Sequence, residues 1–167
     1  GTGLIFNHEI DSIQNVTVAA GFTRQISENA NKTAYYSNAY ALGLAYNFVH
    51  TTYGLDLAHK DTKNKGGAGN KVKNNEVTAV IRQGLNEDWN VYAMYSYKTE
   101  KTLPAGSAYS KSTDRQFLVG TEYYVFKQGS VKVKPFIEWQ ATRTKYENSA
   151  VDRSRDFKTV IGLRAYW

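Results

Sequence analysis

The side chains best suited to acid–base or metal chemistry are few and are poorly spaced for it. The three histidines are His8, His50 and His59, and none has the neighbours that a zinc site or a catalytic triad requires. Asp56 and Asp61 stand close to His59, so an acid–base pair is the one hydrolytic alternative. The chain has no cysteine, which excludes disulfide frameworks and cysteine-based zinc sites. We therefore predict no enzyme, no metal site and no cofactor.

Phosphate and nucleic-acid chemistry also find little support. A Lys-Gly-Gly-Ala-Gly stretch lies within residues 61–75, but it lacks the Lys-Ser/Thr ending of a phosphate-binding loop, and we interpret it as a surface loop. The formal net charge is +6, and the basic residues are spread from Arg24 to Arg164. Tyrosines and lysines fall largely on opposite faces of the strands predicted below, which argues against binding of single-stranded nucleic acid.

The elements that position these side chains are predicted to be strands. The chain has 13 tyrosines and 2 prolines, and 14% of its 167 residues are aromatic, which favours strands. No apolar run approaches the roughly 18 residues of a transmembrane helix. Instead, apolar and polar residues alternate with a period of two, so that each strand has one apolar and one mixed polar face. The nine predicted strands span residues 4–9, 16–23, 36–48, 53–60, 76–82, 89–98, 117–125, 131–139 and 157–167.

The connections between these strands alternate in length. Short ones lie at 12–15, 49–52, 86–88 and 127–130, whereas long polar ones lie at 27–33, 61–75, 102–114 and 148–156. Short periplasmic turns that alternate with long extracellular loops are typical of outer-membrane barrels. The pattern therefore predicts an all-β fold, a transmembrane antiparallel up-and-down β-barrel, as a single domain over residues 1–167.

In a lipid-embedded barrel the apolar face is turned outward and the polar face lines the interior. Aromatic side chains at strand ends favour this orientation, because aromatic rings gather at membrane interfaces. The predicted interface aromatics are Tyr46, Phe48, Tyr53, Trp89, Tyr123, Trp139 and Trp167. The predicted pore-lining residues are Asp56, Lys60, Glu76, Arg82, Lys98, Glu122, Lys132, Lys134, Glu138, Lys158 and Arg164.

Several of these segments, in this order, resemble the general diffusion porins of Gram-negative outer membranes. The similarity is carried by Phe117-Leu-Val-Gly-Thr-Glu-Tyr-Tyr-Val-Phe-Lys-Gln-Gly-Ser130, by Phe136-Ile-Glu-Trp139 and by the closing segment 156–167. Upstream segments 41–46, 53–57 and 75–77 extend it over the chain. The resemblance implies an outer-membrane location, a homotrimer, and passive diffusion of ions and small hydrophilic solutes.

The chain also departs from that family. Trp167 stands where a terminal phenylalanine is usual, and nine strands correspond to the last nine of the family's sixteen. We expect the C-terminal part of a larger porin, and two alternatives stay open: eight strands that close alone with a structural or adhesive role, or a wall completed by another chain. A soluble ligand-binding barrel is a third class. Because basic residues outnumber acidic ones on the predicted inner face, we expect a mild preference for anions.

Overall fold

The computed structural model describes residues 14–28, 34–64, 70–104, 108–129, 131–148 and 152–167. Nine strands and no helix occur in these ranges. Nothing in the same ranges is a helix of the length and apolarity needed to cross a membrane. The strands are β1 (Gln14–Glu28), β2 (Ala34–Phe48), β3 (Thr51–Asn64), β4 (Lys71–Gly84), β5 (Trp89–Leu103), β6 (Ser110–Tyr123), β7 (Phe126–Gln128), β8 (Val131–Glu147) and β9 (Arg153–Tyr166).

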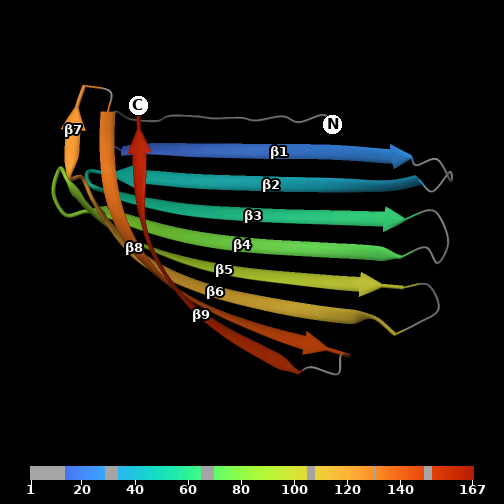
Figure 1. The fold of residues 1–167 in the computed structure, drawn as a ribbon. Coiled ribbons are helices and arrows are strands. Elements are labelled where there is room, and N and C mark those ends of the chain that lie inside the picture. The colour runs from blue at the N-terminus through green and yellow to red at the C-terminus, as the bar shows by residue number, and fades with distance from the viewer. Residues whose placement is uncertain (1–13, 29–33, 65–69, 105–107, 130, 149–151) are drawn as a thin grey trace.

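The strands form one antiparallel sheet in which neighbours along the chain are neighbours in space. The order is β1-β2-β3-β4-β5-β6-β8-β9, and the short β7 pairs with the first residues of β8. This confirms the predicted all-β, antiparallel, up-and-down arrangement. The sheet curls along its length, and its last strands turn out of the plane of the first ones (Figure 1).

Strand β7 continues β6 past a bulge. Glu122 pairs with Phe136, but Phe126 pairs with Val133, so three residues on one strand face two on the other. Pro135 lies where this pairing is interrupted, a position at which a residue without an N–H group is tolerated. Nine strands less β7 therefore leave eight long strands that cross the sheet.

The two ends of the sheet differ as predicted. Short connections at one end are Val49 and His50, the segment 85–88, and a turn that contains Gly129. Gly129 has φ 59°, a conformation that favours glycine. In segment 85–88 the side chain of Asn86 accepts the backbone N–H groups of Asp88 (2.9 Å) and Trp89 (2.8 Å), which stabilises the turn. At the other end longer stretches of chain separate Glu28 from Ala34, Asn64 from Lys71, Leu103 from Ser110 and Glu147 from Arg153.

The strands are longer than the predicted ones at this second end. The expectation that 61–75 and 102–114 are entirely loop is wrong at their ends, since β3 reaches Asn64, β4 begins at Lys71 and β6 begins at Ser110. Strand pairing persists there although both faces are polar, so hydrophobic periodicity gives no signal. The predicted strand at 4–9, with His8, lies outside the described residues.

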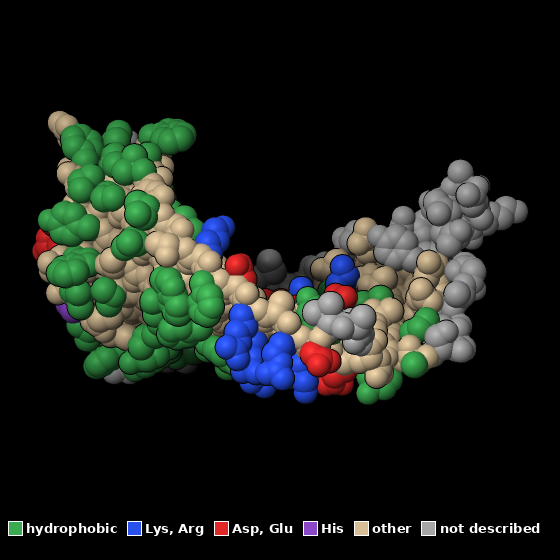
Figure 2. Space-filling model, turned by 60° about the horizontal axis from the view of Figure 1, so that its bottom comes forward, with side chains coloured by type: hydrophobic (Ala, Val, Ile, Leu, Met, Phe, Trp, Pro, Cys, Tyr) green, Lys and Arg blue, Asp and Glu red, His purple; other side chains and the backbone are tan. Residues whose placement is uncertain are grey.

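The register separates the side chains into one apolar and one polar face. Rows such as Leu42, Leu57 and Val77 run from strand to strand on the apolar face. No hydrophobic side chain among the described residues is buried, and the large exposed ones lie mainly in these rows. Hydrophobic side chains cover the end of the molecule that carries the short turns (Figure 2). In the described residues β1 pairs only with β2 and β9 only with β8, so the predicted closure into a barrel is not present in this sheet.

Candidate functional site: a charged cluster on the polar face

All of the predicted pore-lining residues lie on one face of the sheet, opposite the apolar rows. Pairings such as Glu76 with Lys98, and Lys134 with Arg164, connect them across the strands. The structure brings five of them together near the short turns: Arg82, Glu122, Lys134, Glu138 and Arg164. We call these five residues the charged cluster.

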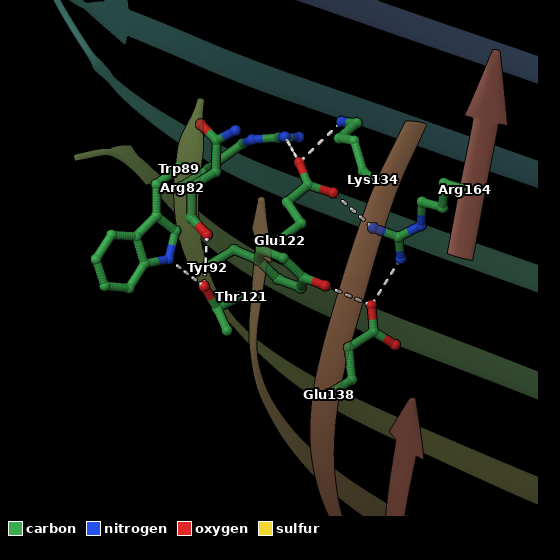
Figure 3. Close-up of polar contacts among 9 residues, drawn as sticks. Arg82, Trp89, Tyr92, Thr121, Glu122, Lys134, Glu138 and Arg164 are labelled. Atoms are coloured by element: carbon green, nitrogen blue, oxygen red, sulfur yellow. Dashed lines mark hydrogen bonds and ion pairs between the residues drawn. The ribbon is translucent and has the colours of Figure 1, made fainter. Parts of the chain in front are cut away.

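Glu122 is the centre of the charged cluster. Only 2% of its surface is exposed, and its Oε1 accepts hydrogen bonds from Arg82 Nη2 and from Lys134 Nζ, the latter at 3.0 Å. Its Oε2 accepts from Arg164 Nη1 at 2.8 Å. Three cations from β4, β8 and β9 therefore share one carboxylate on β6, which ties four strands together (Figure 3).

Arg164 connects this centre to a second carboxylate. Its Nη2 donates to Glu138 Oε1 at 2.7 Å, and the same oxygen accepts the hydroxyl of Tyr92 at 2.6 Å. The guanidinium also lies over the ring of Phe136, 4.1 Å from its centroid. Because its donors and its flat face are both engaged, Arg164 is held in one orientation.

Two glycines make room for the aromatic rings of this network. Tyr92 lies directly across from Gly120, and a Cβ at Gly120 would come within 2.6 Å of the Tyr92 ring. In the same way Phe136 covers Gly162, where a Cβ would come within 2.5 Å of the ring. Each ring therefore lies flat against the strand next to its own, and the Tyr92 hydroxyl reaches beyond Gly120 to Glu138.

Lys134 is the most enclosed cation of the charged cluster. Its exposed fraction is 5%, and its ammonium group lies 4.7 Å from the Tyr124 ring centroid and 5.2 Å from that of Tyr166. The aromatic rings favour the cation and keep water from it. Three basic and two acidic groups leave the charged cluster with a formal charge of +1.

The other predicted pore-lining residues are spread over the polar face. These residues take part in no ion pair in the described part of the chain. The set consists of Asp56, Lys60, Glu76, Lys98, Lys132 and Lys158. Glu76 and Lys98 are direct cross-strand neighbours, as are Lys98 and Asp114, so charges of opposite sign alternate there. Such pairs stabilise the sheet modestly.

The predicted interface aromatics lie on the apolar face. Tyr46 pairs with Tyr53 across β2 and β3, and their ring centroids are 6.1 Å apart. Trp89 pairs with Tyr123, and its indole N–H donates to Thr121 Oγ1 at 2.6 Å (Figure 3). Phe48 is also near the short turns, whereas Trp139 lies further along β8, and Trp167 follows β9 with 92% of its surface exposed.

The acid–base pair of Asp56 and His59 is wrong in its geometry, because these residues lie on opposite faces of β3. His59 instead contacts Asp61 (Nε2 to Oδ2, 3.3 Å) and Asn75 (Nδ1 to Oδ1, 2.6 Å) on the exposed apolar-parity face. Within the described ranges no group of three His, Cys, Asp or Glu residues is arranged to hold a metal ion.

Sequence reasoning did not identify Tyr92 and Phe136 as members of the site. The available signal was a glycine in the middle of each neighbouring strand, since strand glycines often mark a close approach. Such a glycine identifies the aromatic residue that covers it only when the register of the two strands is known.

Comparison of the chain with protein-family models, with curated proteins and with solved structures gave no match.

Proposed function

We propose that this chain forms part of the wall of an outer-membrane β-barrel. The barrel acts as a water-filled, passive diffusion channel for ions and small hydrophilic solutes. The observation that carries the proposal is the two-sided sheet. Its apolar parity is exposed across all eight long strands, and no hydrophobic side chain in the described residues is buried. An apolar surface of this extent requires a nonaqueous partner, and hydrocarbon fits a surface that curves away from its polar face.

The strand lengths agree with this proposal. Strands of 14–17 residues exceed the roughly 9–11 that cross a bilayer. The excess lies at the end with the longer connections, where both faces are polar. That end would project from the membrane on the extracellular side, as the resemblance to the porins implies.

Solutes would be selected by pore width and by the charges of the polar face. In the charged cluster most charges neutralise one another, so it acts chiefly as a rigid part of the wall. Lys98, Lys132 and Lys158 have no ion pair in the described part of the chain and would face the solute. Among the predicted pore-lining residues these lysines outnumber Asp56 and Glu76, which supports a preference for anions. Glu100, Asp114 and Asp156 lie on the same face by register, so the proposed preference is mild.

A sheet with two open edges requires further strands before it is stable in lipid. The proposal therefore includes additional wall, from a longer chain of this kind or from other copies, and a homotrimer as the resemblance implies. Membrane lipid contacts the outer face, and neither nucleic acid nor a cofactor has a role.

The test is reconstitution of the protein into planar bilayers and into liposomes. We expect steady single-channel steps, together with entry of small sugars that declines as the sugar becomes larger. Protein that inserts into the bilayer but carries neither ions nor sugars would refute the channel. A reversal potential that favours potassium over chloride would refute the anion preference alone.

A second candidate is a small closed barrel of eight strands with a structural or adhesive role. Two observations favour it: the described residues form eight long strands, and the ion pairs of the charged cluster are of the kind that fills a small barrel. Such a barrel would insert into the bilayer without conductance, so the same experiment separates the two candidates.

A further inference from the structure

Three arginines form a row on the apolar face. Arg115 on β6 pairs with Arg143 on β8, which in turn pairs with Arg155 on β9. On β3, β4 and β5 the same row continues as Leu57, Val77 and Tyr97. A cross-strand row that is apolar on one half of the sheet is therefore entirely cationic on the other half.

No acidic group forms an ion pair with this row in the described ranges, although Glu147 and Asp152 line neighbouring grooves together with Arg115 and Arg143. In the described ranges none of the three guanidinium groups has a carboxylate within 4.0 Å. The guanidinium of Arg115 lies over the Tyr97 ring, 5.8 Å from its centroid. The next row toward the loops adds Lys145 opposite Arg153. Like charges directly opposite one another destabilise a sheet, so the row is costly unless an anion joins it.

An apolar groove adjoins the arginine row on the side of the short turns. Its volume is about 280 Å³, and its lining includes Phe117 and Phe157 together with all three arginines. Figure 2 shows a group of Lys and Arg side chains that follows the hydrophobic side chains along the lower surface of the molecule. A hydrocarbon groove with guanidinium groups at its rim is complementary to a lipid with a charged headgroup.

We propose that the row of Arg115, Arg143 and Arg155 binds the phosphate of a phosphorylated membrane lipid, whose acyl chain lies along the groove. The inference rests on the proposed membrane location of the apolar face. Arginine suits phosphate because its planar fork donates two parallel hydrogen bonds to two oxygens. The lipid phosphate joins three like charges that have no ion pair in the described part of the chain, and the acyl chain covers Phe117 and Phe157. An acidic protein or a nucleic acid could pair with the arginines, but neither has a hydrocarbon chain to fill the groove.

The test measures lipid binding by the membrane-inserted protein. The protein is folded into phosphatidylcholine vesicles, and phosphatidic acid is titrated while protein-bound lipid is counted by native mass spectrometry. The variant Arg115→Gln, Arg143→Gln, Arg155→Gln should bind phosphatidic acid at least about tenfold more weakly than the wild type, because several charge-assisted hydrogen bonds are lost.

A control variant removes the same charge from the loop end of the apolar-parity face outside the groove: Lys63→Gln, Lys73→Gln, Lys101→Gln. It should bind phosphatidic acid almost as the wild type does. Equal loss in both variants, or no loss in the arginine variant, would overturn the proposal.

Two further readouts separate the remaining outcomes. Inorganic phosphate at the same concentration should not displace the lipid, because half of the contact is apolar, and displacement would overturn the lipid assignment. Flotation with pure phosphatidylcholine vesicles is measured first. Wild-type protein that fails to float refutes the proposed function and this inference with it, whereas inserted protein without a variant effect refutes the inference alone.

Discussion

Neutralising Glu122 tests whether the charged cluster holds the wall together. The variant Glu122→Gln keeps the size of the side chain but removes the charge that three cations share. Arg164 retains Glu138 at 2.7 Å, and Arg82 is partly exposed and can be hydrated, so these two lose little. Lys134 is 5% exposed and loses its only carboxylate among the described residues. Breaking a buried ion pair from one side costs about 3–5 kcal/mol, and we expect about 3 kcal/mol because part of the cluster is hydrated.

Urea unfolding of the membrane-folded protein provides the measurement. With a slope of about 2 kcal/mol per molar urea, the midpoint of the transition should fall by about 1.5 M. Glu76→Gln is the matched control, since it removes the same charge from the same face where no ion pair is present in the described part. That control should stay within about 0.5 kcal/mol of the wild type.

A double variant tests whether the loss of stability comes from the unpaired Lys134 cation. Lys134→Met added to Glu122→Gln removes the stranded cation and should restore more than half of the lost stability, because a pair replaced by apolar groups is often close to neutral. If Glu122→Gln and Glu76→Gln had equal effects, or if the double variant were no more stable than Glu122→Gln alone, the charged cluster would not hold the wall together.

Three further results are expected. Gly162→Ala should lower stability by about 1–3 kcal/mol, because the new Cβ would lie 2.5 Å from a ring atom. Gly54→Ala should have almost no effect in the same urea assay, because its new Cβ would lie 3.7 Å from the nearest atom, the Cβ of Val80. Lys158→Glu should move the reversal potential of the channel toward cations, and an unchanged potential under a salt gradient would mean that this residue does not face the pore. In variants with a single tryptophan, brominated lipid chains should quench Trp139 most strongly when the label is deep and Trp89 when it is shallow; equal depth profiles would contradict the orientation of the sheet.

The face on which each strand side chain lies could be predicted from the sequence, because alternation is a steric property of the extended backbone. Glu122, Glu138 and Arg164 therefore share a face whatever the details of pairing. That they touch could not be predicted. Glu122 and Arg164 are 42 positions apart, and their contact depends on the pairing of β6 with β8 and of β8 with β9.

The strand ends and the bulge could not be predicted from the sequence, for a different reason. Near Lys63 and Lys71 both faces are polar, so the contrast on which periodicity depends vanishes while backbone pairing continues. The bulge between Tyr123 and Phe126 inserts one residue and exchanges the faces, so the strand predicted over 117–125 ends at Tyr123.

The bulge also changes how the wall can be completed. An odd number of strands would leave the first and last strands parallel, but β7 is a continuation of β6, so eight strands of the described ranges cross the sheet. Strand β1 runs from the short-turn end toward the loops and β9 runs back, so the two open edges are antiparallel (Figure 1). In hydrocarbon every unpaired backbone group on these edges costs several kcal/mol. Whatever closes an all-antiparallel wall must therefore add an even number of strands to the eight described ones, zero included. With zero, eight strands enclose an interior that side chains fill; with eight more, the polar face lines an aqueous channel. The presence or absence of conductance therefore indicates whether strands are added to these eight, as well as which of the two functions applies.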